Sequence, residues 1–371
     1  MEKKRILVFI GASYVSGLEI STLHLLHGLK RDGHDVRCVV NGWNDGVFRQ
    51  KLDEAGIPWW QPKVGWLYIR KPLWTLDSLQ HWPRAYRECK RILETFDPQV
   101  CHFSSFTTAL MIYPLLKGRN CVYNLQEPRE RNRKHLFIYG LLNKRFKIFT
   151  TVSRRIVSML EGLDIPKEKI RLIYNGVPAL ENVVATRPAG EAVVFAIVGQ
   201  IVPWKGHDTL VEAVERLMGH APVPFVVYIF GNDQNEYSRR LKATIEVKGL
   251  TQLFEWKGFV REQAEIYRQT DVIIVPSLSE EPCSLTILEA MMRKKGLIVS
   301  DRGGNPELVT HGETGMIFAA GNPADLALCM QYLLGDAALI EKMGEKAGRK
   351  ALEAFTETRM TQEYEKVYAE L

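Results

Sequence analysis

The sequence lacks most of the patterns that assign a chain to a membrane, disulfide or metal class. Its longest apolar runs have the length of a strand, so no segment is long enough to span a bilayer. The first of these runs, residues 6–10, is also too short for the apolar core of a signal peptide. Six scattered cysteines form no C-x-x-C pair and no His/Cys cluster with zinc spacing. They favour a reducing, cytoplasmic compartment.

The charged residues are unevenly distributed along the chain. The net charge is +6, but residues 1–180 hold 29 Lys and Arg against 16 Asp and Glu, whereas residues 181–371 hold 20 against 27. Halves of opposite charge are expected to meet different partners. A nucleic-acid binder would explain the basic half. No known nucleic-acid-binding motif accompanies the charge, however, so we expect no nucleic-acid partner.

Apolar strand-like runs alternate with helical patterns along the whole chain. This alternation is typical of βαβ units and predicts an α/β protein with parallel sheets. A polar stretch without periodicity, residues 179–191, predicts a linker. We therefore expect two Rossmann-like domains, over residues 1–180 and 181–355. The last residues, 356–371, predict a helix whose apolar stripe packs back on the first domain.

The most informative stretch is a strand–turn–helix pattern over residues 271–292. Residues 272–275 read Val-Ile-Ile-Val, which predicts a buried parallel strand. A polar loop containing Glu281 follows, and then a helix with Glu289 about one turn from its start. In an open α/β sheet, ligands bind beyond the carboxyl ends of the strands, where helix N-termini present free N–H groups. The pattern therefore predicts a binding site.

These residue types suit a phosphorylated nucleoside. The amides of Ser284, Leu285 and Thr286 could hold a diphosphate at the helix N-terminus. An ionised carboxylate is an acceptor with two oxygens, so Glu289 could take both hydroxyls of a ribose. Glu281, nearer the end of the strand, could hold hydroxyls of the group that the diphosphate carries. The alternative is an ordinary strand, turn and helix with two exposed glutamates.

The string Glu281-Pro282-x6-Glu289-Ala290-Met291 resembles the E-P-x6-E-A-M signature of retaining glycosyltransferases with the GT-B fold, in particular glycosyltransferase family 4. The resemblance implies two Rossmann-like domains that face each other across a cleft. It also implies that Glu289 binds the nucleotide ribose and that Glu281 contacts the donor sugar. The chain departs from the family at Ser284, where a glycine is usual; a small residue with its own N–H can serve in the same place.

Further stretches match family motifs in the family's order. Ser16 and Gly17 stand where a Gly-Gly pair is common, and the resemblance places this loop near the donor phosphates. Lys205 matches the donor-phosphate lysine of the family's G-R-x4-K-G loop, whereas Gln200 replaces its arginine. Val260 lies in a loop that is commonly near the nucleobase. The resemblance therefore adds these five residues to the candidate donor site.

The acceptor side is predicted from the first half of the chain. Gln126 stands where the family often has a histidine near the reacting sugar, and glutamine can still hydrogen-bond a sugar hydroxyl. His102 matches a recurrent family histidine; a strand-end histidine satisfied by backbone groups is the alternative. Residues 57–82 hold five of the eight tryptophans and show no helical or strand period. With Trp66 and Trp74, this stretch predicts either an aromatic wall for a sugar or lipid, or a packed irregular loop.

A basic segment predicts contact with a membrane. Residues 129–147 hold seven basic side chains with apolar residues between them, which is the pattern of a basic amphipathic helix. Arg131, Arg133 and Lys134 are its candidate membrane-side or acceptor-side residues. We expect a protein bound peripherally to the anionic inner face of the cell membrane. The alternatives are a solvated face and a site for a soluble anionic acceptor.

Together these features predict a retaining glycosyltransferase. It would move a sugar from a nucleotide sugar, with UDP as the expected nucleotide, to a hydroxyl of a glycan or lipid-linked acceptor in the synthesis of cell-surface polysaccharide or glycolipid. Glu281, Lys205 and Gln126 are the candidate catalytic residues. No Asp-x-Asp motif occurs, so we expect neither a metal ion nor another cofactor. The alternatives are a non-hydrolysing sugar-nucleotide epimerase and an inert partner in a membrane complex.

Overall fold

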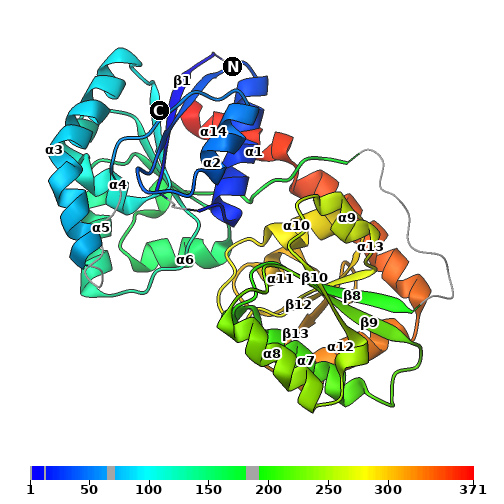
Figure 1. Cartoon of the computed structure of the whole chain (residues 1–371). Coiled ribbons are helices and arrows are strands. Elements are labelled where there is room, and N and C mark those ends of the chain that lie inside the picture. Colours follow the sequence, from blue (N-terminus) through cyan, green and yellow to red (C-terminus); the bar gives the residue numbers. More distant parts are fainter. Residues whose placement is uncertain (1, 12–13, 65–71, 181–191) are drawn as a thin grey trace. The chain divides into compact units, whose positions relative to one another are not determined.

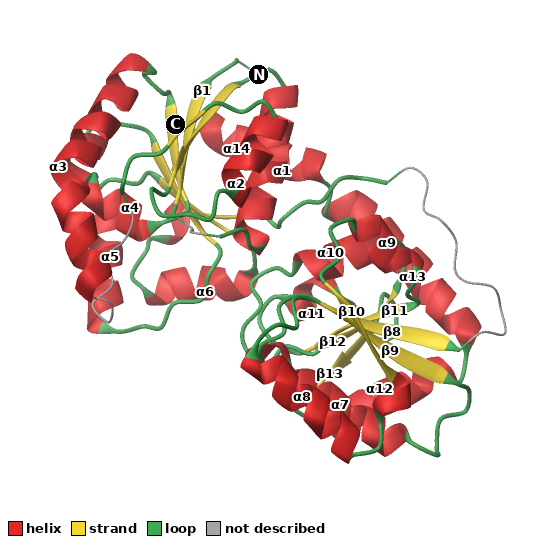
Figure 2. Ribbon diagram, viewed as in Figure 1, coloured by secondary structure: helices red, strands yellow, loops and turns green. Residues whose placement is uncertain are grey.

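The chain forms two α/β units, each with a parallel sheet between layers of helices (Figures 1 and 2). The computed structural model describes residues 2–11, 14–64, 72–180 and 192–371. The first unit comprises Met1–Gly176 together with Glu357–Leu371, and the second comprises Val177–Thr356. Both units are Rossmann-like, as the sequence predicted.

The first unit has a seven-stranded sheet in the order β3-β2-β1-β4-β5-β6-β7, with all pairs parallel. The strand order reverses between β1 and β4, and open α/β sheets commonly bind ligands beyond the carboxyl ends of strands at such a reversal. The strands are β1 (Arg5–Ile10), β2 (Asp35–Val40), β3 (Trp59–Trp60), β4 (Val100–Phe103), β5 (Cys121–Leu125), β6 (Ile148–Thr151) and β7 (Ile170–Leu172).

Helices cover both faces of this sheet (Figure 1). Because strand side chains alternate between faces, Leu7 and Phe9 of β1 pack in one apolar cluster and Ile6, Val8 and Ile10 in the other. The helices are α1 (Gly17–Arg31), α2 (Val47–Glu54), α3 (Pro72–Thr95), α4 (Phe106–Met111), α5 (Arg133–Asn143), α6 (Arg154–Gly162) and α14 (Glu357–Ala369), with short 3-10 turns η1 (Tyr113–Leu116) and η2 (Lys167–Lys169).

The second unit has a six-stranded parallel sheet in the order β10-β9-β8-β11-β12-β13, which reverses between β8 and β11. Its strands are β8 (Val193–Val198), β9 (Phe225–Phe230), β10 (Phe254–Gly258), β11 (Val272–Val275), β12 (Gly296–Ser300) and β13 (Met316–Phe318). Its helices are α7 (His207–Leu217), α8 (Glu236–Val247), α9 (Gln263–Arg268), α10 (Leu285–Met292), α11 (Asn305–Leu308), α12 (Pro323–Leu334) and α13 (Ala337–Ala354), with 3-10 turns η3 (Pro203–Lys205) and η4 (Thr251–Leu253).

The C-terminal helix α14 packs on the first unit, as predicted. Its apolar stripe, Tyr364, Val367 and Tyr368, is at most 3% exposed. On the facing helix α1, a Cβ at Gly28 would lie 1.9 Å from Thr361 Oγ1, so only glycine allows the two helices to come this close. Helix α14 therefore belongs to the same apolar core as the first two strands.

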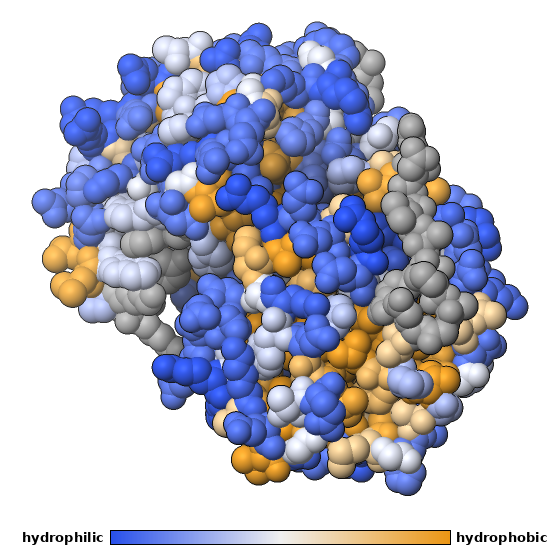
Figure 3. Space-filling model, turned by 45° about the vertical axis from the view of Figure 1, so that its right-hand side comes forward, coloured by the Kyte–Doolittle hydropathy of each residue, from blue (hydrophilic) through white to orange (hydrophobic). Residues whose placement is uncertain are grey.

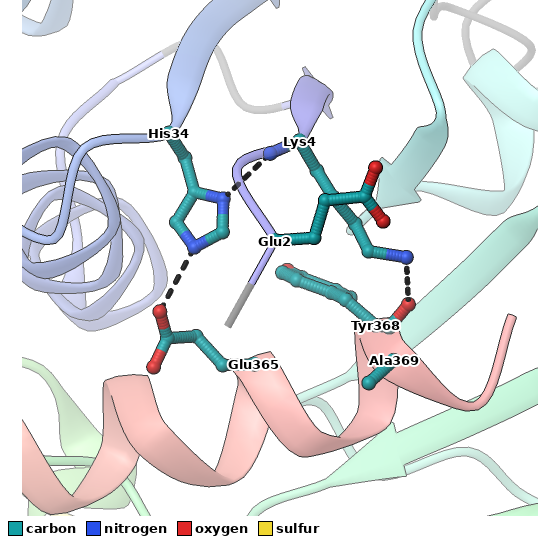
Figure 4. Close-up of a pocket in the computed structure, with 6 residues that line it drawn as sticks. All are labelled: Glu2, Lys4, His34, Glu365, Tyr368 and Ala369. Carbon is teal, nitrogen blue, oxygen red and sulfur yellow. Dashed lines mark hydrogen bonds and ion pairs between the residues drawn. The ribbon is translucent and has the colours of Figure 1, made fainter.

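A buried histidine also holds α14 in place (Figure 4). His34 Nδ1 accepts a hydrogen bond of 3.1 Å from the Lys4 amide, so the ring proton lies on Nε2, which donates to Glu365 at 2.8 Å. Lys4 Nζ donates to the carbonyl of Tyr368 at 2.9 Å. These residues line a pocket of about 140 Å³, together with Glu2 and Ala369. Contacts between residues more than 300 positions apart thus join the two ends of the chain.

Among the described residues, no helix is both long enough and apolar enough to cross a membrane.

Candidate active site

The site is built on the turn between β11 and α10. Strand β11 covers Val272–Val275, all four residues of which are buried, as the apolar run predicted. Helix α10 begins at Leu285, after the N-cap Ser284. The first amides of a helix have no carbonyl partner within it, so those of Leu285 and Thr286 are free to bind an anion beyond the edge of the sheet.

Glu281 lies in this turn with one carboxylate oxygen occupied. Its Oε1 accepts hydrogen bonds from Ser277 Oγ at 2.7 Å and from the ammonium group of Lys205. For Oε2 no hydrogen bond to a described residue is recorded. The carboxylate is therefore held in one orientation by two donors, and its second oxygen can accept from the hydroxyls of a ligand.

Two glycines in the loop after β12 hold the backbone of Glu281. The amide of Gly304 donates to the Glu281 carbonyl at 2.7 Å. Gly303 has a φ of +59°, and a Cβ there would lie 2.2 Å from the same carbonyl oxygen. Because any other residue would push this loop away, the glycine pair fixes the position of the carboxylate.

Lys205 reaches Glu281 from the loop between β8 and α7. The loop can lie against the end of β11 because the next residue, Gly206, has a φ of +78° and would place a Cβ 1.9 Å from the carbonyl oxygen of Pro276. The Lys205 ammonium also lies 4.3 Å from the centre of the Trp204 ring. The fold thus joins two sequence motifs that are 76 residues apart.

Glu289 is buried one turn into α10 and is held by helix α9. Gln263 Nε2 donates to its Oε1 at 2.5 Å, and the Tyr267 hydroxyl donates to its Oε2 at 2.9 Å. Burial raises the pKa of Glu289, and these two hydrogen bonds and the nearby Arg293 act in the opposite direction. Each carboxylate oxygen has two lone pairs, so both oxygens keep one for a ligand.

A small cavity lies where the ends of β8 and β11 meet these two loops. Its volume is about 10 Å³, which is room for about one water molecule. The predicted donor residues Gln200, Lys205, Ser284 and Thr286 line it together, and Leu285 follows Ser284. Val260 follows β10, two strands away on the same sheet edge, and is not among the cavity's described lining residues. The polar side chains of this cavity are Gln200, Lys205, His207, Ser277, Ser284 and Thr286.

In the first unit, the predicted residues lie at the start of α1 and the end of β5. Ser16 precedes α1, and both its amide and its hydroxyl donate to Glu19 Oε2, at 2.8 and 2.6 Å. Gly17 is the first residue of the helix. Gln126 follows β5 and accepts from Ser21 Oγ at 3.1 Å. These residues share the carboxyl edge of the sheet: Ser16 and Gly17 follow β1 at the reversal of strand order, and Gln126 follows β5, one strand beyond β4.

The placement of His102 on the acceptor side is wrong. His102 is 1% exposed, and its Nδ1 hydrogen-bonds the Tyr368 hydroxyl at 2.8 Å. Burial lowers its pKa to about 4, so the ring is neutral and packs beside Tyr364 and Tyr368 of α14. Its partner is thus a side chain of the C-terminal helix and not a backbone group of its own strand.

The basic amphipathic helix predicted over residues 129–147 does not form as one element. Helix α5 begins only at Arg133, and of the seven basic residues only Arg133 and Lys134 lie within it, both exposed. Arg129 pairs with a glutamate two residues away, and Arg131 donates to a backbone carbonyl at 2.7 Å. Arg145 lies 4.8 Å from an aromatic ring centre. The segment therefore exposes fewer free charges than its composition suggested.

The tryptophan-rich stretch is also more regular than predicted. Trp59 and Trp60 form the edge strand β3, and α3 begins at Pro72, so Trp74 is helical and 41% exposed. The absence of a helical period was therefore misread for residues 72–82. Trp66 lies outside the described residues.

Two family models match successive parts of the chain. The model "Glycosyltransferase Family 4" matches residues 15–179, and "Glycosyl transferases group 1" matches residues 181–350. The chain belongs to the family 4 glycosyltransferases. The matched ranges correspond closely to the two α/β units.

Relatives of this glycosyltransferase differ in how much they share with it. A D-inositol 3-phosphate glycosyltransferase from Nocardia farcinica is 32% identical over 43% of this chain and 36% of its own length. The lipopolysaccharide core mannosyltransferase LpcC of Rhizobium leguminosarum is 28% identical over 58% of this chain and 62% of its own. Several curated relatives are thus matched over less than two thirds of their length. The Bacillus subtilis protein YtcC is 26% identical over 85% of this chain.

Solved structures share the whole fold of the glycosyltransferase. A glycosyltransferase from Rickettsia africae aligns with a TM-score of 0.84 and 20% identity over 100% of this chain and 99% of that protein. Anabaena HepE, solved with UDP and glucose, aligns with a TM-score of 0.82 and 18% identity over 99% and 100%. At these identities the likeness establishes the GT-B fold alone.

Proposed function

We propose that the chain transfers a sugar from a nucleotide sugar to a hydroxyl group of a glycan or lipid-linked acceptor. The observation that carries this proposal is the grouping of Lys205, Glu281 and the α10 N-terminus at one sheet edge. Glu289 lies about one turn further along α10. The expected nucleotide is UDP, which HepE holds in its crystal structures. The relatives that act on lipopolysaccharide support an acceptor in cell-surface glycan or glycolipid synthesis.

Each group has a role in the proposed reaction. Lys205 and the free amides of α10 stabilise negative charge on the leaving diphosphate, because preorganised donors act strongly where charge develops. Glu289 holds the ribose hydroxyls, and Oε2 of Glu281 holds a hydroxyl of the donor sugar. On the acceptor side, Gln126 hydrogen-bonds a sugar hydroxyl. No cofactor takes part in this scheme.

We propose that the reaction retains configuration by front-face displacement. In this step the bond from the anomeric carbon to the phosphate oxygen breaks, and the acceptor oxygen bonds to the same face. The acceptor proton passes to an oxygen of the leaving diphosphate. Glu281 is assigned to sugar binding and not to nucleophilic attack, because Lys205 and Ser277 donate to Oε1 and Oε2 is proposed to accept a hydroxyl of the donor sugar.

Donor turnover tests this function directly. Purified protein should release the nucleoside diphosphate from one member of a panel of nucleotide sugars. The sugar should be recovered either on an added acceptor or, after hydrolysis, as the free sugar. Conversion of the donor to an epimer without any acceptor would favour the epimerase instead. An inert partner in a membrane complex would turn over no donor on its own.

The same assay tests the need for a metal ion. The sequence has no Asp-x-Asp motif, and the described residues hold no group of three acidic, His or Cys side chains that could bind a metal. The positive charge near the proposed diphosphate is therefore that of Lys205 and the N-terminus of α10. Turnover should persist in EDTA. Complete loss in EDTA, with recovery on adding Mg²⁺ or Mn²⁺, would contradict this expectation.

We also propose that the first unit docks on an anionic membrane. Helix α3 presents three leucines outward at its start: Leu73 is 77% exposed, Leu76 63% and Leu79 50%. Three residues apart along a helix, they lie on one face. The exposed Arg84 and Arg87 follow on the same helix. Figure 3 shows an apolar group at the left-hand edge, below a part of the surface that is mostly hydrophilic. Such a helix can insert its leucines while its arginines meet acidic headgroups.

Co-sedimentation with vesicles tests the docking. Replacing Leu73, Leu76 and Leu79 by Ser should lower binding to phosphatidylglycerol vesicles about tenfold or more, because buried leucines each contribute roughly 1.5–3 kcal/mol. Leu328→Ser is the matched control, since Leu328 is 63% exposed on α12 in the second unit. Binding should also weaken in 1 M salt, where the Debye length is about 3 Å. Equal binding to neutral vesicles, or no effect of the leucine changes, would exclude this docking mode.

A further inference from the structure

A buried histidine lines the small cavity beside Lys205, and the proposed roles leave it unused. His207 is the first residue of α7 and is 2% exposed. Neither of its ring nitrogens makes a hydrogen bond with a described residue. The Val202 carbonyl lies close enough to influence the ring, but not in hydrogen-bonding geometry. A buried polar group without a partner is costly, so such groups in folded proteins call for an explanation.

The chemistry of this imidazole suits hydrogen bonding without charge. Burial, and then the positive charge of Lys205, lowers its pKa to about 4, so the ring is neutral near pH 7. A neutral imidazole carries one N–H donor and one acceptor nitrogen. Its neighbour Asp208 accepts from the Tyr237 hydroxyl at 2.8 Å, and the Tyr237 ring packs edge-on, with its centre 6.2 Å away. These contacts hold the ring without using its nitrogens.

The position of His207 points to an anion. It follows Gly206, the N-cap of the eleven-residue helix α7, whose first amides have no partner within the helix. The same cavity is lined by Ser284 and Thr286 at the start of α10. Two helix N-termini therefore border one cavity at the ends of the neighbouring strands β8 and β11, and His207 and Lys205 line the same cavity. Helix N-termini attract negative charge.

We propose that His207 binds the diphosphate of the donor by donating its ring N–H to a non-bridging phosphate oxygen. This inference rests on the proposed function and adds a phosphate contact from α7 to those of Lys205 and α10. The family's usual arginine in this loop is Gln200 here. The neutral His207 ring would supply a hydrogen bond to the phosphate next to the same loop. Lys205 would then be the cation that this loop contributes. The competing explanation is that His207 only fills space beneath Tyr237.

Two substitutions separate binding from filling. His207→Phe keeps a ring of similar size and removes both nitrogens, whereas His207→Gln keeps an N–H donor. Isothermal titration with inorganic pyrophosphate, and with the nucleoside diphosphate that the wild type binds best, is the measurement. His207→Phe should weaken both ligands about tenfold or more, as expected for a lost hydrogen bond to a charged group. His207→Gln should recover part of that loss.

Glu289→Ala provides the matched comparison. It removes the proposed ribose contact, so it should weaken the nucleoside diphosphate and leave pyrophosphate binding within about threefold of the wild type. Wild-type affinity of His207→Phe for pyrophosphate would overturn the inference. A second result would also overturn it. In that case His207→Phe loses pyrophosphate affinity because it no longer shows a folded melting transition, and His207→Gln is folded but binds pyrophosphate no better than His207→Phe. A wild type that binds no nucleoside diphosphate would refute the proposed function itself.

Discussion

Replacing Glu289 by Ala should weaken the binding of the donor's nucleoside diphosphate by about 10²–10⁴-fold. The carboxylate is proposed to accept two ribose hydroxyls, and each hydrogen bond to a charged acceptor contributes about 1.5–3 kcal/mol. Gln263 and Tyr267 hold its oxygens from α9, so the acceptor is already oriented before the ligand arrives. Isothermal titration calorimetry with the nucleoside diphosphate is the measurement. Unchanged affinity in a folded variant would refute the ribose assignment.

The folded state should tolerate this change. Burial raises the pKa of Glu289 above that of an exposed glutamate, so the ionised carboxylate disfavours the folded state above that pKa and becomes less costly as the pH falls. Its removal therefore deletes an unfavourable burial, although it leaves the Tyr267 hydroxyl with only the more distant Thr286 carbonyl, at 3.4 Å, as acceptor. Glu341→Ala on the exposed side of α13 is the control, because it removes a carboxylate far from the site in sequence and should change neither affinity nor melting.

The pH dependence gives the same contact a second signature. Ribose hydroxyls donate to the ionised form of Glu289, so bound ligand lowers the pKa that burial has raised. Affinity should consequently fall as the solution is acidified through the pKa of the free protein. In Glu289→Gln this part of the pH dependence should disappear, since the amide does not titrate in that range.

The β11–α10 turn could be predicted from the sequence because its signals are local. A continuous apolar run predicts a buried parallel strand, and the helical spacing after it predicts α10. The structure has both where the sequence placed them. The order of the motifs likewise predicted two Rossmann-like units. Local order along the chain is enough for this level of description, because each βαβ unit is contiguous in sequence.

The errors concern residues whose environment is set by distant parts of the chain. His102 was expected on the acceptor side from a family motif, with a strand-end histidine satisfied by backbone groups as the alternative, but its partner is the Tyr368 hydroxyl, 266 residues away. The seven basic residues of 129–147 looked like one helix face, because composition does not reveal where α5 begins. Side chains such as Arg131 and Arg145 are already engaged by neighbouring groups.

The missed members of the site left weaker signals in the sequence. Gln263 and Tyr267 are four residues apart, a spacing that places both on one face of α9 toward Glu289. Ser277, four residues before Glu281, shares its turn. His207 had only its position after the Lys205-Gly206 pair to mark it. A polar residue directly after such a phosphate motif lies at the N-terminus of the following helix, where anions bind.

Lys205→Met should lower kcat by about 10²–10³-fold with a smaller effect on KM, because its ammonium is proposed to stabilise charge that grows as the diphosphate leaves. Before the donor binds, this ammonium pairs with Glu281 Oε1 and lies 4.3 Å from the centre of the Trp204 ring. The ion pair already orients the Lys205 side chain, so the proposed contact with the leaving phosphate needs little rearrangement. Steady-state kinetics with the active donor is the measurement.

Two controls make the result specific to the charge at this position. Lys248→Met removes another lysine of the second unit, which pairs with Glu215 at 2.6 Å, and should leave kcat unchanged. In Lys205→Met the buried carboxylate of Glu281 keeps only Ser277 as a recorded donor, so part of the loss could come from its reorientation. Adding Glu281→Gln to Lys205→Met separates the two effects, since the amide carries no charge to be compensated. If the ammonium acts on the diphosphate, the double variant stays as slow as Lys205→Met or becomes slower. If Lys205 serves only to neutralise Glu281, the double variant is as active as Glu281→Gln alone, and the proposed phosphate role of Lys205 is then wrong.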